Sequence, residues 1–197
     1  VMLFDLDRFK EVNDSFGHDA GDLLLREVAH RLSSMSNETN TFYRLGGDEF
    51  ALLSHELTEE SAVNLAMEIC ECIKKAYIIG NSTVTIGTCV GIVVSELERR
   101  SDYLYKFADL ALYEAKRAGL NMIKVFRRIM LQKLEESRTL ERDLSVAVAN
   151  KELVVYYQPI VDSYTTEIYG YEALLRWNHP VKGIIAPDDF ISVAEKT

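Results

Sequence analysis

Three carboxylates of the sequence stand beside features that would hold them rigidly. Asp5 follows a short apolar run over residues 1–4, and Asp48 and Glu49 follow directly on a Gly-Gly pair. Carboxylate oxygens are the ligands that hard cations such as Mg²⁺ prefer. Spacing alone does not bring Asp5 to the other two, and acids that merely flank a surface loop are the alternative interpretation.

The Gly-Gly pair itself predicts how the second two acids are placed. Gly46 and Gly47 separate two runs rich in β-formers, 41–45 and 48–53. A two-residue connection of this kind is the signal of a tight hairpin whose turn needs positive φ. We therefore expect Asp48 and Glu49 to begin a strand directly after the turn.

The remaining elements follow from periodicity and from turn residues. We expect strands over 1–4, 83–94 and 122–126, helices over 20–34, 58–77 and 102–118, and Asp19 as the cap of the first helix. A charged amphipathic helix over 127–149 then leads to strands 153–161 and 167–177 and to a loop that holds Pro180, Gly183 and Pro187. The organisation expected is one domain over 1–126, a linker helix over 127–149, and the beginning of a second domain over 150–197.

Composition limits the classes of partner. With 22 basic and 31 acidic residues the net charge is −9, which argues against a broad basic surface for nucleic acid. No apolar run is long enough for a transmembrane helix and no leader is evident, so we expect a cytoplasmic segment without membrane contact, whose parent protein could be tethered elsewhere. Cys70, Cys72 and Cys89 are interpreted as reduced thiols.

The heptapeptide from Arg44 to Phe50, RLGGDEF, is the signature of the GGDEF family. The stretches DLDRFK at 5–10, ND at 13–14, FGHDAGD at 16–22 and ALYEAK at 111–116 also resemble motifs of that family. The resemblance covers residues 1 to about 126. It implies an α/β (α+β) domain that is adenylate-cyclase-like and ferredoxin-like, with a central antiparallel sheet and flanking helices.

The resemblance also implies a reaction and its residues. GGDEF domains condense two GTP molecules into cyclic di-GMP with release of pyrophosphate, and two domains must face each other as a homodimer. By analogy, two Mg²⁺ (or Mn²⁺) ions would be held by Asp5, the Leu6 carbonyl, Asp48 and Glu49. Asp48 and Glu49 would be catalytic, and either Asp48 or a metal-bound water would act as the base. The residues implied to contact substrate are Lys10, Asn13, Asp22, Arg44, Gly46, Gly47 and Lys116.

Two departures from the family pattern keep alternatives open. Leu120, in Gly119-Leu120-Asn121, stands where the family usually has a basic residue, and residues 37–40 lack the Arg-x-x-Asp of the family's product-inhibition site. The first departure would remove one charge-assisted phosphate contact. A GTP-binding module that regulates an EAL phosphodiesterase is therefore the alternative to a cyclase, and a scaffold that binds no GTP is a third possibility.

Beyond the linker, residues 155–161 and 170–177 resemble the start of the EAL family, whose TIM-like barrel hydrolyses cyclic di-GMP with two metal ions. The resemblance implies that Glu172 is a metal ligand and that Gln158 and Arg176 contact substrate. A barrel of this kind takes about 250 residues, so the stretch present here is expected to supply only its first strands. Phosphodiesterase activity is not expected from it.

Overall fold

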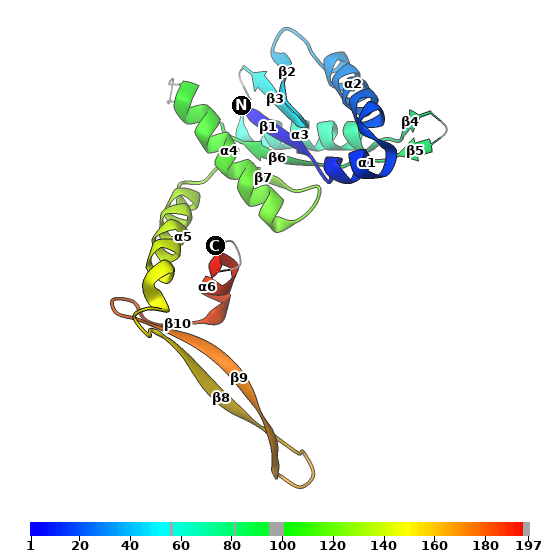
Figure 1. Ribbon diagram of the computed structural model, residues 1–197. Helices are drawn as coiled ribbons and strands as arrows, with labels where there is room; N and C mark the ends of the chain where they lie inside the picture. Colours follow the sequence, from blue (N-terminus) through cyan, green and yellow to red (C-terminus); the bar gives the residue numbers. More distant parts are fainter. Residues whose placement is uncertain (56, 81, 95–100, 195–197) are drawn as a thin grey trace. The chain divides into compact units, whose positions relative to one another are not determined.

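The structure is a computed structural model that describes residues 1–55, 57–80, 82–94 and 101–194. It divides into two compact units, residues 1–130 and 131–197 (Figure 1). The first unit has the mixed α/β fold expected from the sequence.

A five-stranded sheet in the order β2-β3-β1-β6-β7 forms the centre of the first unit. Its strands are β1 (Met2–Leu6), β2 (Asn40–Gly46), β3 (Glu49–Ser54), β6 (Thr88–Ile92) and β7 (Ile123–Val125). The β2-β3, β3-β1 and β1-β6 pairs are antiparallel, but β6 and β7 are parallel. The expectation of an antiparallel sheet is thus corrected to a mixed one. The parallel pair is possible because helix α4 (Ser101–Ala118) provides the crossover from β6 to β7.

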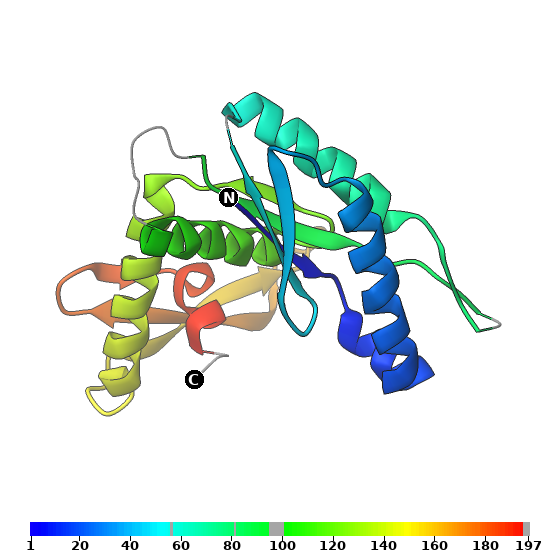
Figure 2. The ribbon, with the colours of Figure 1, turned by 90° about the horizontal axis from the view of Figure 1, so that it is seen from above.

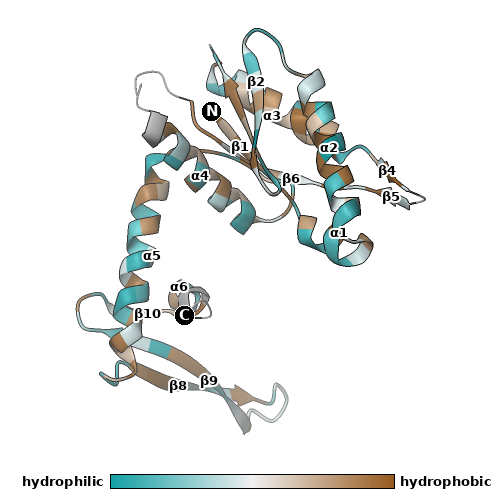
Figure 3. Cartoon of the chain, turned by 45° about the horizontal axis from the view of Figure 1, so that its top comes forward, coloured by the Kyte–Doolittle hydropathy of each residue, from teal (hydrophilic) through white to brown (hydrophobic). Residues whose placement is uncertain are grey.

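Helices cover both faces of this sheet, as Figure 2 shows. The helices are α1 (Phe9–Phe16), α2 (His18–Ser34), α3 (Glu59–Lys74) and α4. Alternation along β1 sends Met2, Phe4 and Leu6 into the core beneath α2 and α3, whereas Leu3 packs on the other side among residues of α4. Figure 3 shows the corresponding hydrophobic and hydrophilic stripes on these helices.

Glycine at position 91 allows α4 to lie close to the sheet. A Cβ there would lie 2.2 Å from both the Ala108 carbonyl oxygen and the Leu112 nitrogen of α4. Any side chain would push the helix away from β6. The last turn of α4 carries Lys116, so this close contact also fixes the distance between the backbone of that lysine and the sheet.

Three expectations about this unit were wrong. Asp19 is not the cap of α2, because that position is taken by Gly17 with φ 86°, which follows the helix α1 that residues 9–16 form without having been predicted. The helix expected to reach Tyr77 ends at Lys74, since Lys75 has extended backbone angles. Strand 83–94 is divided into β5 (Ser82–Val84) and β6, because β5 leaves the sheet and pairs with β4 (Tyr77–Ile79).

The second unit contains most of helix α5 (Arg128–Ala147), a long hairpin of β8 (Leu153–Val161) and β9 (Ile168–His179), strand β10 (Gly183–Ile185) and helix α6 (Pro187–Ala194). The loop expected around Pro180, Gly183 and Pro187 is therefore structured. Pro187 suits the first helical position, where its missing N–H costs nothing. The unit has a small core that consists of Leu144, Ala147, Trp177, Ile185 and Phe190.

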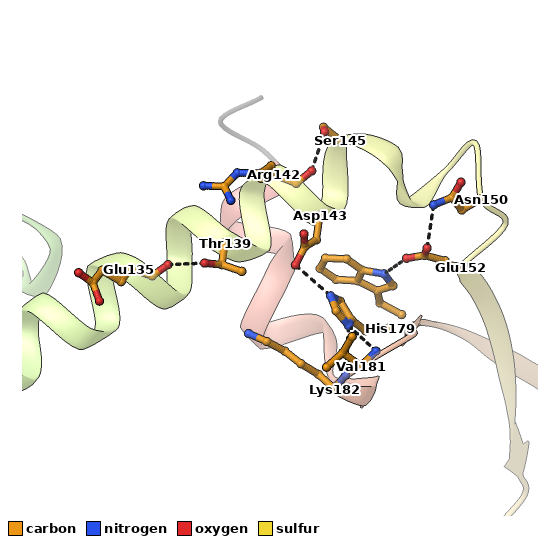
Figure 4. Close-up of polar contacts among 11 residues, drawn as sticks. Glu135, Thr139, Arg142, Asp143, Ser145, Asn150, Glu152, His179, Val181 and Lys182 are labelled. Atoms are coloured by element: carbon orange, nitrogen blue, oxygen red, sulfur yellow. Dashed lines mark hydrogen bonds and ion pairs between the residues drawn. The ribbon is translucent and has the colours of Figure 1, made fainter.

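Polar contacts complete that small core (Figure 4). The Trp177 indole N–H donates to Glu152 Oε2 at 2.9 Å, and His179 Nε2 lies 3.1 Å from Asp143 Oδ2. The end of α5 is thereby joined to the end of β9. No helix in the described part of the chain is long and apolar enough to span a membrane.

Candidate functional site

The β2-β3 hairpin turn is braced by its own strand. Gly47 has φ 51°, a left-handed conformation that glycine adopts without strain. The Arg44 guanidinium donates to the Gly47 carbonyl through Nε at 3.1 Å and Nη2 at 2.9 Å. Arg44, which the family resemblance assigns to substrate, thus holds the turn in this structure. The predicted tight hairpin is confirmed, but its turn consists of Gly47 and Asp48 and not of Gly46 and Gly47, because Gly46 still belongs to β2 and pairs with Glu49. Asp48, which was expected to begin the second strand, therefore lies in the turn.

Strand register gathers the candidate acids. Asp5 of β1 is the direct partner of Glu49 of β3, and the Leu6 N–H donates to the Asp48 carbonyl at 3.3 Å. Directly opposite residues of an antiparallel pair have their side chains on the same face. Asp5 and Glu49, which are 44 positions apart, therefore share one face at the end of β1, and Asp48 lies next to them.

Asp5 has the most unusual environment of these acids. Its side chain is only 15% exposed, and the Lys116 ammonium lies 2.5 Å from its Oδ2 atom. Burial raises the pKa of Asp5, the hydrogen bond and charge of Lys116 oppose this shift, and the carboxylates of Asp48 and Glu49 raise the pKa further. A desolvated carboxylate beside two others is a place where a cation is strongly favoured.

These oxygen donors fit a magnesium ion in part. In the described residues no group of three acidic, histidine or cysteine side chains is close enough to hold a metal by itself. Mg²⁺ is commonly bound by one or two carboxylates together with substrate phosphates. Asp5 with Asp48 or Glu49 matches that incomplete type of site, in which a phosphate-bearing ligand supplies the remaining oxygens.

Two of the residues implied to contact substrate, Asn13 and Asp22, come from neighbouring helices. Asn13 lies on α1, and a Cβ at Gly21 of α2 would be 1.9 Å from its Oδ1 atom, so the glycine makes room for the amide. Asp22 follows Gly21 and is exposed. The amide and the carboxylate thus belong to the same corner between α1 and α2. Lys10 is exposed on α1.

Asp7 has a structural role that was not predicted from its motif. Its Oδ2 atom accepts the backbone N–H of Asn121 at 2.7 Å, and its Oδ1 atom lies 3.1 Å from the Cys89 thiol. Asp7 thereby ties the turn after α4, which carries Leu120, to the end of β1. The signal that could have revealed it is the two-residue spacing from Asp5, because that spacing puts both acids on the same face of the strand.

A cavity of about 420 Å³ adjoins this turn. Asp7, Phe16, Ile86, Leu120 and Asn121 are among the residues that line it. The Leu120 side chain is 47% exposed. The position where the family has a base is thus an apolar, half-exposed rim of this cavity, whose lining includes Asp7 but not Asp5, Asp48 or Glu49.

In the second unit the three predicted EAL residues share one face of the hairpin. Gln158 of β8 is the direct partner of Glu172 of β9, and Arg176 lies four residues further along β9. Side chains separated by an even number of residues in a strand are on the same side. Gln158 and Glu172 are both exposed.

Comparisons with known proteins agree with both resemblances. Residues 1–122 match the family model described as "Diguanylate cyclase, GGDEF domain", and residues 141–197 match the model of the EAL domain. The whole chain is 40% identical to the Pseudomonas aeruginosa protein named bifunctional diguanylate cyclase/cyclic di-GMP phosphodiesterase MucR, and covers 29% of it. It is 37% identical to cyclic di-GMP phosphodiesterase PdeR of Escherichia coli, and covers 30% of that protein. The chain thus spans less than a third of these relatives.

Solved structures show the same fold for the first unit. The isolated GGDEF domain of TpbB (YfiN) from Pseudomonas aeruginosa matches with a TM-score of 0.64 and 33% identity, over 68% of this chain and 80% of that chain. The GGDEF domain of DgcB from Caulobacter crescentus, a complex with cyclic di-GMP, matches with a TM-score of 0.57 and 28% identity, over 63% of this chain and 73% of that one.

Proposed function

Because this chain belongs to the GGDEF family of diguanylate cyclases and continues into part of an EAL domain, we propose that its first unit condenses two GTP molecules into cyclic di-GMP. The observation that carries the proposal is the register that sets Asp5 opposite Glu49, next to Asp48, at the end of β1. This arrangement suits the binding of a triphosphate with its cation.

In the proposed reaction the 3′-hydroxyl of one GTP attacks the α-phosphorus of the other. A new O3′–P bond forms, the bond between the α-phosphorus and the bridging oxygen breaks, pyrophosphate leaves, and Asp48 takes the hydroxyl proton. The same transfer in the opposite direction closes the ring and releases the second pyrophosphate. Two domains must face each other, so the active form is a homodimer.

The other residues bind and orient the nucleotide. Asp5, the Leu6 carbonyl, Asp48 and Glu49 would hold two Mg²⁺ or Mn²⁺ ions, which supply charge neutralisation of the triphosphate. The amide of Asn13 and the carboxylate of Asp22 together can satisfy the acceptor and donors of a guanine edge. Lys10 and Lys116 would contact phosphates, and Gly46 and Gly47 would let the backbone approach the nucleotide closely.

The second candidate function is a regulatory one, and Leu120 is the observation that favours it. An apolar side chain at this rim provides no charge for a phosphate. A domain that binds GTP but turns it over slowly could control the EAL part of a longer protein. The names of the relatives agree with either reading, since MucR is named for both activities and PdeR for the phosphodiesterase alone.

For the second unit we propose that it contributes some of the residues of a cyclic di-GMP binding site. Glu172 would be a metal ligand there, with Gln158 and Arg176 as substrate contacts. One face of a hairpin is too little to enclose a substrate, and we expect no phosphodiesterase activity from residues 150–197.

Incubation of the purified chain with GTP and Mg²⁺, followed by chromatography for cyclic di-GMP, tests the proposal. Product that disappears in Asp48→Ala and is lost in Glu49→Gln supports a cyclase. Binding of GTP without any product selects the regulatory function. Absence of both binding and product contradicts each of them and leaves the scaffold interpretation.

A further inference from the structure

Lys116 is the ion-pair partner of Asp5, the candidate metal ligand on β1. It belongs to the last turn of α4 and lies 2.5 Å from Asp5 Oδ2, at the end of a strand 111 positions away. The Asp5 side chain is 15% exposed and the Lys116 side chain 43% exposed. The carboxylate is therefore fixed by the sheet, whereas the ammonium is held at the end of a flexible chain that reaches solvent.

We propose that Lys116 couples metal binding to nucleotide binding by exchanging Asp5 for a phosphate when both ligands arrive. The inference rests on the proposed function, because it assumes that Asp5 serves a cation that accompanies GTP. In the free protein Lys116 pairs with Asp5. In the nucleotide complex it would make the phosphate contact already proposed.

A cation and the Lys116 ammonium compete for one oxygen of Asp5. A cation that binds Asp5 Oδ2 must displace the ammonium, since the two positive charges would otherwise meet at a single carboxylate. The displaced lysine would leave an ion pair with a largely buried partner. A metal ion that binds without nucleotide must offset this loss with few protein ligands. In the described residues no group of three acidic, histidine or cysteine side chains could hold it.

A bound nucleotide changes the partners of both the cation and Lys116. A triphosphate supplies the oxygens that the protein lacks and offers Lys116 a new anionic partner. Movement of one exposed lysine end then suffices, without displacement of α4, which Gly91 holds against β6. Metal and nucleotide should therefore each bind weakly alone and strongly together, and the coupling must be equal in both directions.

Titration calorimetry measures this coupling without any turnover. Mn²⁺ is titrated into the nucleotide-free chain and into the chain saturated with α,β-methylene-GTP, for the native protein and for Lys116→Met. The matched control is Lys106→Met, which removes an exposed positive charge from the same helix. Thermal unfolding of each variant verifies the fold, and Lys116→Gln replaces Lys116→Met if the latter does not fold.

Without nucleotide, the Lys116 variant should bind Mn²⁺ about tenfold more tightly than the native chain, whereas Lys106→Met should not differ from it. The analogue should increase the Mn²⁺ affinity of the native chain by at least about tenfold and that of the variant by clearly less. Equal Mn²⁺ affinities of the variant and native chains without nucleotide, while the native chain does bind the analogue, would overturn this inference and leave the proposed function intact. Failure of the native chain to bind the analogue in the presence of Mn²⁺ would instead overturn the proposed function.

Discussion

The carboxylate of Asp7 accepts the backbone N–H of Asn121 at 2.7 Å and so anchors the turn after α4 to the end of β1. On the other side of the same carboxylate the Cys89 sulfur lies 3.1 Å from Asp7 Oδ1 and 3.2 Å from the Gly119 carbonyl oxygen. Burial raises the pKa of Cys89 to about 11, so the thiol keeps its proton at neutral pH and can donate. The turn that presents Leu120 is therefore held from two directions.

Removal of the anchor should free this turn. In Asp7→Ala the Asn121 amide loses a charged acceptor, and a hydrogen bond of that type is worth about 1.5–3 kcal/mol. We expect the exchange of the Asn121 amide hydrogen, measured by NMR, to accelerate by about 10- to 100-fold. Asp7→Asn retains an oxygen acceptor and should change the rate much less. An unchanged rate in Asp7→Ala would show that the bond does not hold the turn.

Substitution of Leu120 tests the departure from the family pattern. If the turn faces a phosphate, Leu120→Arg adds a charge-assisted hydrogen bond and should tighten binding of a GTP analogue by about tenfold or more. Leu120→Met is the matched control, because it keeps the size and the apolar character of the side chain. Equal affinities of the two variants, measured by titration calorimetry, would mean that the phosphates lie elsewhere.

Local sequence signals predicted the hairpin, the long helices and the mixed α/β class, because each depends on neighbours in the chain. The two glycines at 46 and 47 indicate the hairpin, although its turn lies one residue later, at Gly47 and Asp48. The parallel β6-β7 pair and the departure of β5 from the sheet depend on contacts between distant segments, and periodicity does not record them. The site follows the same rule, since the Asp5–Glu49 register and the Asp5–Lys116 ion pair exist only in three dimensions.

Arg31 joins two helices through the backbone. Its guanidinium donates to the carbonyls of Cys72 at 3.1 Å and of Lys75 and Ala76 at 2.6 Å, all at the end of α3, and lies 3.6 Å above the centre of the Tyr77 ring. Lysine cannot reproduce this fork of donors or its stacking. We expect Arg31→Lys to lower the free energy of unfolding by about 1–3 kcal/mol in urea, monitored by circular dichroism. Arg26→Lys, an exposed change on the same helix, should lower it by less than about 0.5 kcal/mol.

Alkaline pH should weaken the first unit. Burial raises the pKa of Tyr77 and of Cys70 to about 12 each, from ordinary values near 10 and 9. The folded state favours the protonated forms, so their stabilising contribution is complete below pH 9 and is lost as pH rises towards 12. Each group steepens the fall in the free energy of unfolding by up to about 1.4 kcal/mol per pH unit in that window.

Tyr77→Phe isolates one part of this pH dependence. The buried Tyr77 hydroxyl has no hydrogen-bond partner among the described residues, so its removal should leave stability at pH 7 unchanged or slightly higher. Between pH 10 and 12, the window between the two pKa values of Tyr77, the variant should lose stability less steeply than the native chain. Urea unfolding at a series of pH values measures both slopes, and identical slopes would show that Tyr77 does not titrate with unfolding.

The contact between His179 and Asp143 should decide how firmly α5 is attached to the hairpin of the second unit. The backbone N–H groups of Val181 and Lys182 donate to His179 Nδ1 at 3.1 Å each, so the ring proton lies on Nε2 and is donated to Asp143. His179 is 7% exposed, and Asp143→Ala would leave that N–H unpaired, at a cost of about 1–3 kcal/mol.

The chain has a single tryptophan, Trp177, and it is fully buried in the second unit, so its fluorescence reports the unfolding of that unit alone. We expect Asp143→Ala to shift the fluorescence transition to lower urea concentration, whereas Asp143→Asn, which keeps an acceptor for Nε2, should shift it less. Unfolding of the first unit, followed through the chemical reactivity of the buried Cys89, should be the same in all three proteins. If both transitions shifted together, the Asp143 contact would stabilise the first unit as well as the second. The prediction that it acts only on the attachment of α5 would then be wrong.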